Sequence, residues 1–131
     1  MDNSLKTGYY IVEAIKDNDE LIEMIGEDKI WPLAALESTT FPYIIYSRDQ
    51  IAVQYTKCCN HDNQVVITFR VYSNDYLQAL EIANQLRNLL EHKQLVIKDE
   101  IYINEIKVAS VSEMFSEDSF CQAISFQMAV E

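Results

Sequence analysis

Two thiols, an imidazole and a carboxylate fall within five residues, from Cys58 to Asp62. Such groups can bind zinc, or can pair a thiolate nucleophile with an adjacent base. Zinc needs a second set of ligands at defined spacing, and the remaining His92 and Cys121 stand far away in the sequence without a partner motif. A nucleophile needs an orienting third group and a pocket, which a polar hairpin tip does not supply. We therefore interpret this cluster as a polar hairpin tip.

Other catalytic and cofactor signatures are missing from the sequence. Gly8 and Gly26 are the two glycines, so neither a phosphate-binding loop nor a dinucleotide fingerprint can be written. There is no Gly-x-Ser-x-Gly elbow and no Cys-x-x-Cys pair. The carboxylates are spread along helix starts and loops, which indicates a solvated acidic surface rather than a facing catalytic pair. The sequence predicts no enzyme activity, no cofactor and no metal ligand.

The composition indicates one folded domain, residues 1–131, with 49% hydrophobic residues. No apolar run approaches the roughly 18 residues of a membrane span, and the N-terminus lacks the pattern of a signal peptide, so we expect an intracellular product. Three cysteines, two of them adjacent, favour reduced thiols.

The net charge of −11 argues against binding to a phosphate backbone, although an acidic wall beside DNA would let the DNA slide past without sticking.

Hydrophobic spacing predicts the elements. Helical periods cover 4–16, 19–25 and 76–92, and Asn18 or Asp19 can cap the second helix, which Gly26 ends. Residues typical of strands cover 43–55 and 64–72, around a polar tip, and then 100–111 and 119–130, around a polar loop at 112–118. Residues 30–31 and 95–97 read as short extended pieces.

The order α-α-β-β-α-β-β predicts an α+β two-layer sandwich, in which a four-stranded, mainly antiparallel sheet carries helices on one face. The other face would be open, polar and suited to packing against a copy of the chain or a neighbour. A monomer with a solvated open face is the alternative. We expect this face to carry Tyr46 or Tyr43, Thr68, Arg70, Tyr72, Ala123, Ser125 and Gln127.

Two aromatic-proline steps, Trp31-Pro32 and Phe41-Pro42, bracket the passage from helices to sheet. Each proline fixes its own φ and pushes the preceding residue toward extended geometry. We predict that Trp31, Pro32, Pro42 and Tyr43 anchor the scaffold. If Trp31 is buried, its replacement by alanine should cost about 3 kcal/mol.

These steps also carry a family resemblance. The sequence has Ile30-Trp31-Pro32, then Phe41-Pro42-Tyr43-Ile44-Ile45-Tyr46, then a strand ending Thr68-Phe69-Arg70-Val71-Tyr72-Ser73, and then a helix with the pattern Ala79-x-x-Ile82-Ala83-x-x-Leu86-x-x-Leu89-Leu90. In this order and spacing it resembles the tail-completion (tail-terminator, head–tail joining) proteins of long-tailed bacteriophages and prophages. The likeness covers about residues 5–92.

The resemblance implies a structural protein that forms a ring, typically a hexamer, which caps the tail tube and joins it to the head connector. It implies no enzyme activity, no cofactor and no association with a membrane. DNA would pass through the lumen of the ring without specific binding. The protein would be in the bacterial host cytoplasm during assembly and then in the virion tail. The alternatives are a small intracellular module that binds a protein or ligand on its open sheet, and an enzyme that uses the thiol cluster. Candidate partner contacts are the loop 112–118 and the loop residues Lys57, Cys58, Cys59, Asn60, His61 and Asp62.

Overall fold

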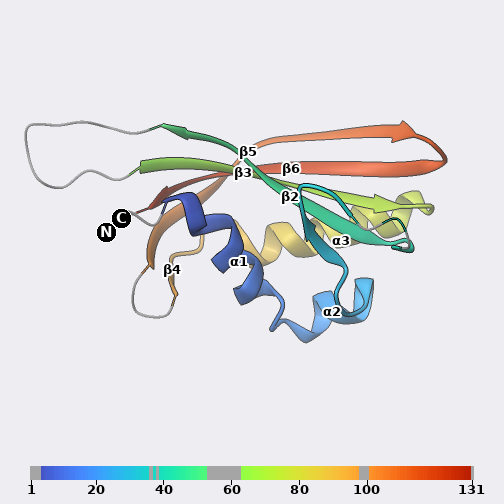
Figure 1. Cartoon of the computed structure of the whole chain (residues 1–131), viewed down its shortest axis with the longest axis horizontal. Coiled ribbons are helices and arrows are strands. Elements are labelled where there is room, and N and C mark those ends of the chain that lie inside the picture. The colour runs from blue at the N-terminus through green and yellow to red at the C-terminus, as the bar shows by residue number, and fades with distance from the viewer. Residues whose placement is uncertain (1–3, 36, 38, 53–62, 98–100, 131) are drawn as a thin grey trace, which may run out of the picture.

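Six strands form one mixed sheet that curls into a half-barrel, in the order β1-β2-β3-β6-β5-β4 (Figure 1). The computed structural model describes residues 4–35, 37, 39–52, 63–97 and 101–130. β1 runs parallel to β2, and every other pair of neighbouring strands is antiparallel. The strands are β1 (Ile30–Pro32), β2 (Tyr43–Ala52), β3 (Asn63–Ser73), β4 (Leu95–Ile97), β5 (Ile101–Ser116) and β6 (Ser119–Val130).

The prediction of a four-stranded, mainly antiparallel sheet in a two-layer sandwich is wrong. The short pieces at 30–32 and 95–97 are not isolated, because they add β1 and β4 to the two edges of the sheet. Each has three residues, too few to show a period, and long-range pairing decides that they are strands. The parallel β1 is held on β2 by flanking bonds, from the Leu33 amide to the Tyr46 carbonyl (2.9 Å) and from the Ile44 amide to the Lys29 carbonyl (2.8 Å).

The loop predicted at 112–118 is also mostly strand. β5 continues to Ser116 and pairs with β6 as far as Ser119. The turn between them consists of Glu117 and Asp118, with φ of 51° and 61°. Positive φ at both turn residues matches the twist of a tight antiparallel hairpin. The result is a long, straight hairpin where the sequence predicted a polar loop (Figure 1).

Within the described residues, three helices and a short 3-10 turn, η1 (Ser4–Lys6), lie on one side of the sheet (Figure 1). α1 covers Thr7–Ile15, α2 covers Asp19–Ile25 and α3 covers Tyr76–Leu90. The predicted cap of α2 is confirmed, because the Asn18 side chain accepts a hydrogen bond from the Leu21 amide (2.9 Å) and Gly26 follows at φ 93°. No described helix has both the length and the apolar content needed to cross a membrane.

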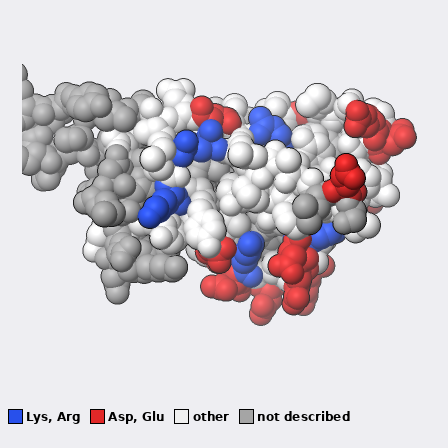
Figure 2. Space-filling view, in the orientation of Figure 1, with Lys and Arg blue, Asp and Glu red and all other residues white. Residues whose placement is uncertain are grey.

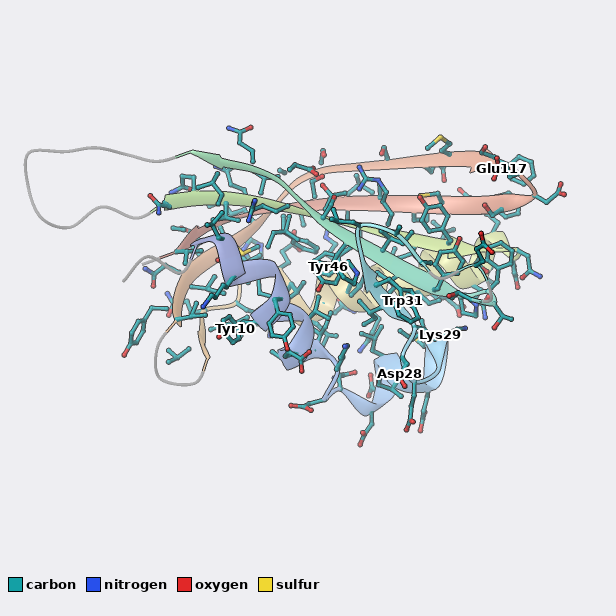
Figure 3. All side chains as sticks on the ribbon, viewed as in Figure 1. Tyr10, Asp28, Lys29, Trp31, Tyr46 and Glu117 are labelled. Carbon is teal, nitrogen blue, oxygen red and sulfur yellow. The ribbon has the colours of Figure 1, made fainter. Side chains whose placement is uncertain are left out.

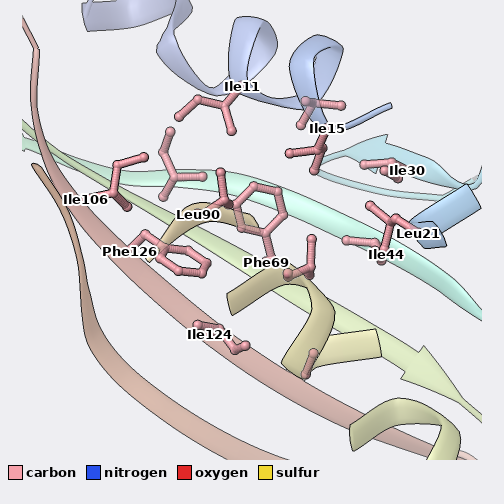
Figure 4. Packing of buried hydrophobic residues seen from close by; sticks show 14 of the residues in the cluster. Ile11, Ile15, Leu21, Ile30, Ile44, Phe69, Leu90, Ile106, Ile124 and Phe126 are labelled. Atoms are coloured by element: carbon pink, nitrogen blue, oxygen red, sulfur yellow. The ribbon is translucent and has the colours of Figure 1, made fainter. Parts of the chain in front are cut away.

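The core lies between these helices and the concave side of the sheet (Figure 4). Phe69 of β3 is fully buried at its centre, with its ring centroid 5.9 Å from Phe126 and 6.2 Å from Tyr46. Gly8 brings α1 close to the sheet, since a Cβ there would lie 3.4 Å from Ile67 Cδ1. α3 contributes a helical stripe of buried residues: Ala79, Ile82, Ala83, Leu86 and Leu90.

The structure places the core contact of β1 at Ile30, which is 5% exposed and belongs to the hydrophobic cluster. Successive strand residues point to opposite faces, so Trp31 points away from that cluster and is half-buried (Figure 3). Pro32 is exposed and Pro42 is half-buried after a cis peptide bond. Replacing Trp31 should therefore cost less than the loss of a fully buried ring. Tyr43 is stacked between Phe41 and Tyr72, with centroids 5.6 and 5.1 Å away.

Candidate functional site

The sheet face that turns away from the helices carries three of the four residues predicted for subunit contact. Thr68, Arg70 and Tyr72 alternate along β3 with the core residues and point to this open face, where Arg70 and Tyr72 are half-buried and Thr68 is buried. Tyr46 does not, because it lies opposite the buried Phe69 and beside α1 (Figure 3). Tyr43, the alternative to Tyr46, pairs with Tyr72 and does lie on the open face.

Hydrogen bonds between side chains connect β2, β3 and β6 on the open face. The Arg70 guanidinium donates to Ser47 Oγ on β2 (3.1 Å), and the hydroxyls of Thr68 and Ser125 on β6 are 2.8 Å apart. The Thr68 hydroxyl also donates to the carboxylate of Asp49, at the bulge of β2. Polar side chains that satisfy one another make a rigid surface that needs no ligand to complete it.

Thiol chemistry finds no support in the described part of the open face. Cys121 is buried beside Tyr72, and burial raises the pKa of the Cys121 thiol, so the thiol stays protonated at neutral pH. The described residues contain no group of three or more His, Cys, Asp or Glu side chains that could hold a metal ion. The predicted partner-contact loop, Lys57, Cys58, Cys59, Asn60, His61 and Asp62, lies outside the described residues.

The far half of the β5–β6 hairpin, residues 109–120, extends beyond the core, and we call it the arm. Every residue from 109 to 118 is exposed. Its apolar side chains include Val111, Met114 and Phe115, which are 52%, 61% and 59% exposed. Isolated exposed apolar residues are ordinary, but such a series on one sheet edge is a contact surface candidate.

One carboxylate fastens the arm to the start of α3. Glu113 accepts hydrogen bonds from the Tyr76 hydroxyl (2.7 Å) and from Gln122 Nε2 (2.8 Å). The rings of Tyr76 and Phe115 each pack on Phe120, with centroids 5.4 and 4.9 Å apart. Together these side chains line a hollow of about 240 Å³. The bonds from Gln122 first, and then from Tyr76, lower the pKa of Glu113 below its usual value.

Glu113→Gln should make the protein's stability less dependent on pH at the acid end. Because the folded-state pKa of Glu113 is depressed, its ionised form stabilises the fold above the unfolded-state pKa, and this contribution is lost as pH falls through the folded pKa. The stability difference between wild type and variant should therefore be present at pH 7 and shrink toward pH 3. Urea unfolding at both pH values measures it, and a difference that grows on acidification would contradict the assignment. The effect should be small, because the site is exposed.

The sheet has two stretches of edge without a neighbouring strand among the described residues. On one side, β4 pairs only with Ile101–Ile103 of β5, and the backbone of His92 and Lys93 adds bonds at Ile106. The β5 edge from 107 to 116 is free. On the other side, β1 covers β2 only from Ile44 to Tyr46, so the β2 edge from 47 to 52 is free. These stretches are candidates for contact by strand addition.

Acidic residues form two groups on the surface, one at α2 and one at the arm tip (Figure 2). α2 and the turn after it carry a group of exposed carboxylates, and Figure 2 shows this end of the molecule in red, with a second red group at the arm tip near Glu117 (Figures 2 and 3). Lysine and arginine are scattered over the face shown. The α2 group consists of Asp19, Glu20, Glu23, Glu27 and Asp28.

Comparison with known protein families identifies the family to which the chain belongs. The model of a family described as Tail completion protein gp17 matches residues 10–129, almost the whole chain. The chain belongs to this tail completion family. The resemblance read from the aromatic-proline steps is thereby confirmed, and the match extends it past Lys93, through β5 and β6. As a tail completion protein, the chain is a structural component of phage tail assembly.

Solved structures share the fold of this tail completion protein. A chain from the "Virion of native gene transfer agent (GTA) particle" superposes with a TM-score of 0.81 at 12% sequence identity, over 94% of this chain and 92% of that chain. A second solved chain superposes with a TM-score of 0.60 at 13% identity, over 95% of each chain. No curated protein matches the sequence.

The arm and the two free edges are the features that sequence reasoning missed. One signal for the arm was present, since Val111, Glu113 and Phe115 continue the alternation of a strand through a stretch without Gly, Pro or Asn. The polar residues between them led to the prediction of a loop. The free edge of β2 had no such signal, because it depends on the short length of β1.

Proposed function

We propose that copies of this chain form a ring, with six copies as the expected number, which caps the tail tube and joins it to the head connector. Membership of the tail completion family over residues 10–129 carries the proposal. The two free sheet edges add to it, because a ring is built from heterologous contacts that use two different patches on each subunit. The proposal contains no catalytic step and no cofactor.

The partners would be further copies of the chain, the tail tube and the connector. The open face would serve as a contact to neighbouring proteins through the half-buried Arg70 and Tyr72, while the buried Thr68 holds the polar network beneath them. The loop Lys57 to Asp62 remains a predicted contact to the tube or connector. Tail and head proteins meet during assembly in the host cytoplasm, and the finished ring would stay in the virion tail.

DNA would pass through the ring without specific binding. The net charge of −11 and the acidic group at α2 oppose binding to a phosphate backbone, and the lysines and arginines on the face shown in Figure 2 are scattered. A negative wall repels DNA and so does not trap it in transit.

Removal of the gene tests this function. Cells that produce the virion without this chain should accumulate filled heads and separate tails, visible by electron microscopy, and a plasmid copy of the chain should restore joined particles. Normal joined particles without the chain would overturn the proposal. The thiol cluster can be tested in the same cells, because a plasmid copy with Cys58→Ser, Cys59→Ser and His61→Ala should restore joining as well as wild type if those side chains do no chemistry.

A further inference from the structure

The outer edge of β5 lacks the features that normally protect a sheet edge. From 107 to 116 the strand carries two charged residues, Lys107 at its start and Glu113, and no proline. The Glu113 carboxylate is already engaged by Tyr76 and Gln122 on its own subunit. Natural edges are usually short, charged or covered, because an open edge templates pairing with another chain. In a chain with a net charge of −11, a long edge with so little charge indicates a partner strand.

The free edge of β2 lies on the opposite side of the sheet and at the opposite end of the strands. Residues that pair side by side across neighbouring strands form a row that crosses the sheet. Ser112, the middle of the free β5 edge, is in the same row as Ala123 of β6, Arg70 of β3 and Ile45 of β2. β1 already covers Ile45. Gln50, the middle of the free β2 edge, lies in the row of Lys107 instead. Each molecule therefore presents two free edges that a neighbouring copy can join head to tail.

Exposed apolar residues flank both edges on the same face of the sheet. Val111 lies opposite the buried Ile124, and therefore on the helix side of β5, with Phe115 four residues on. Beside the β2 edge, the Arg48 guanidinium donates to the carbonyl of Leu5 (3.0 Å), which holds η1 along this strand. The side chain of Leu5 is 71% exposed and that of Tyr9, one helical turn on, is 57% exposed.

We propose that β5 residues 107–116 of one copy pair with β2 residues 47–52 of the next copy, with Val111 and Phe115 packed on Leu5 and Tyr9. This pairing rests on the proposed ring and names its subunit contact. β2 runs antiparallel to β5, so a copy related by rotation about an axis that is tilted from the strand direction adds its β5 to β2 as an antiparallel strand. The apolar residues of both edges then meet on one face.

The two edges fix how neighbouring copies are offset. The rows of Ser112 and Gln50 are four to five residues apart along the strands. At about 3.4 Å per residue, each copy is shifted by roughly 15 Å along its neighbour. A constant shift between neighbours is what a closed ring of tilted strands requires.

Photocrosslinking in assembled tails tests the pairing. Tails are assembled from a mixture of ¹⁴N and ¹⁵N copies that carry p-benzoylphenylalanine in place of Val111, irradiated, digested and analysed by mass spectrometry. We expect mixed-isotope adducts with peptides that contain residues 5–9 or 47–52. The matched control carries the probe in place of Val96 on β4, a residue of similar exposure (59%), and should give no adduct with those peptides.

Each other result overturns the pairing. Adducts between two β5 peptides would show that the edges pair isologously, and adducts with a different tail protein would show that the arm contacts that protein. The absence of adducts would show that Val111 is not packed on a neighbour. The ring itself is judged separately, by the number of copies per tail, so that several copies without the expected adduct would refute the pairing and leave the ring standing.

Discussion

Replacing Phe69 with alanine is expected to lower the free energy of unfolding by about 3–5 kcal/mol. The ring of Phe69 on β3 is fully buried, and it packs on Phe126 of β6 and Tyr46 of β2. Its removal leaves a cavity that the surrounding sheet and helices cannot fill. Because a domain of this kind has a total stability of about 5–15 kcal/mol, a large part of the stability would be lost. Urea unfolding followed by the fluorescence of Trp31 measures the change.

Phe115→Ala is the matched control for this variant. It removes the same side-chain atoms from the same sheet, but Phe115 is 59% exposed on the arm and packs only on Phe120 among the aromatic rings near it. Its loss should cost about 1 kcal/mol or less. Equal losses from the two variants would contradict the division of the molecule into a core and an exposed arm.

The double variant Val111→Glu with Phe115→Glu is expected to abolish assembly while the chain stays folded. Both side chains are exposed in the single chain, so carboxylates there remain solvated and the melting temperature should change little. At the proposed subunit contact the same carboxylates would be buried without partners, which costs several kcal/mol. The affinity between copies should fall at least about hundredfold, and few joined particles should form.

A second double variant controls for the added charge. Val96→Glu with Tyr102→Glu adds the same two charges at residues that pair with each other across β4 and β5, are 59% and 44% exposed, and lie outside the proposed contact. Particle yield should stay near that of wild type. Equal loss of particles from both variants would mean that charge alone, rather than the β5 edge, impairs assembly.

The long elements could be predicted from the sequence because their periods extend over many residues. The buried stripe of α3, the alternation of β3 and the cap of α2 are all local patterns. β1 and β4 could not be predicted as sheet members, since three residues carry no period and only their distant partners make them strands. The wrong fold class follows from this omission.

The face occupied by Tyr46 illustrates the limit of alternation as a guide to the site. A bulge at Asp49 inserts a residue into β2, so counting back from the end of the strand assigns the wrong face to residues before the bulge. Nothing in the amino-acid types marks that bulge. The family could nevertheless be recognised, because the aromatic-proline steps and the spacing that follows them do not depend on which face each residue takes.

The number and place of the copies in isolated tails test the central claim most directly. Cryo-electron microscopy of tails assembled in the absence of heads would show the end of the tube to which the head attaches. We predict a closed ring of this chain at that end, with an arm of each copy lying along the β2 edge of the next. A single copy, or copies distributed along the tube, would contradict the account.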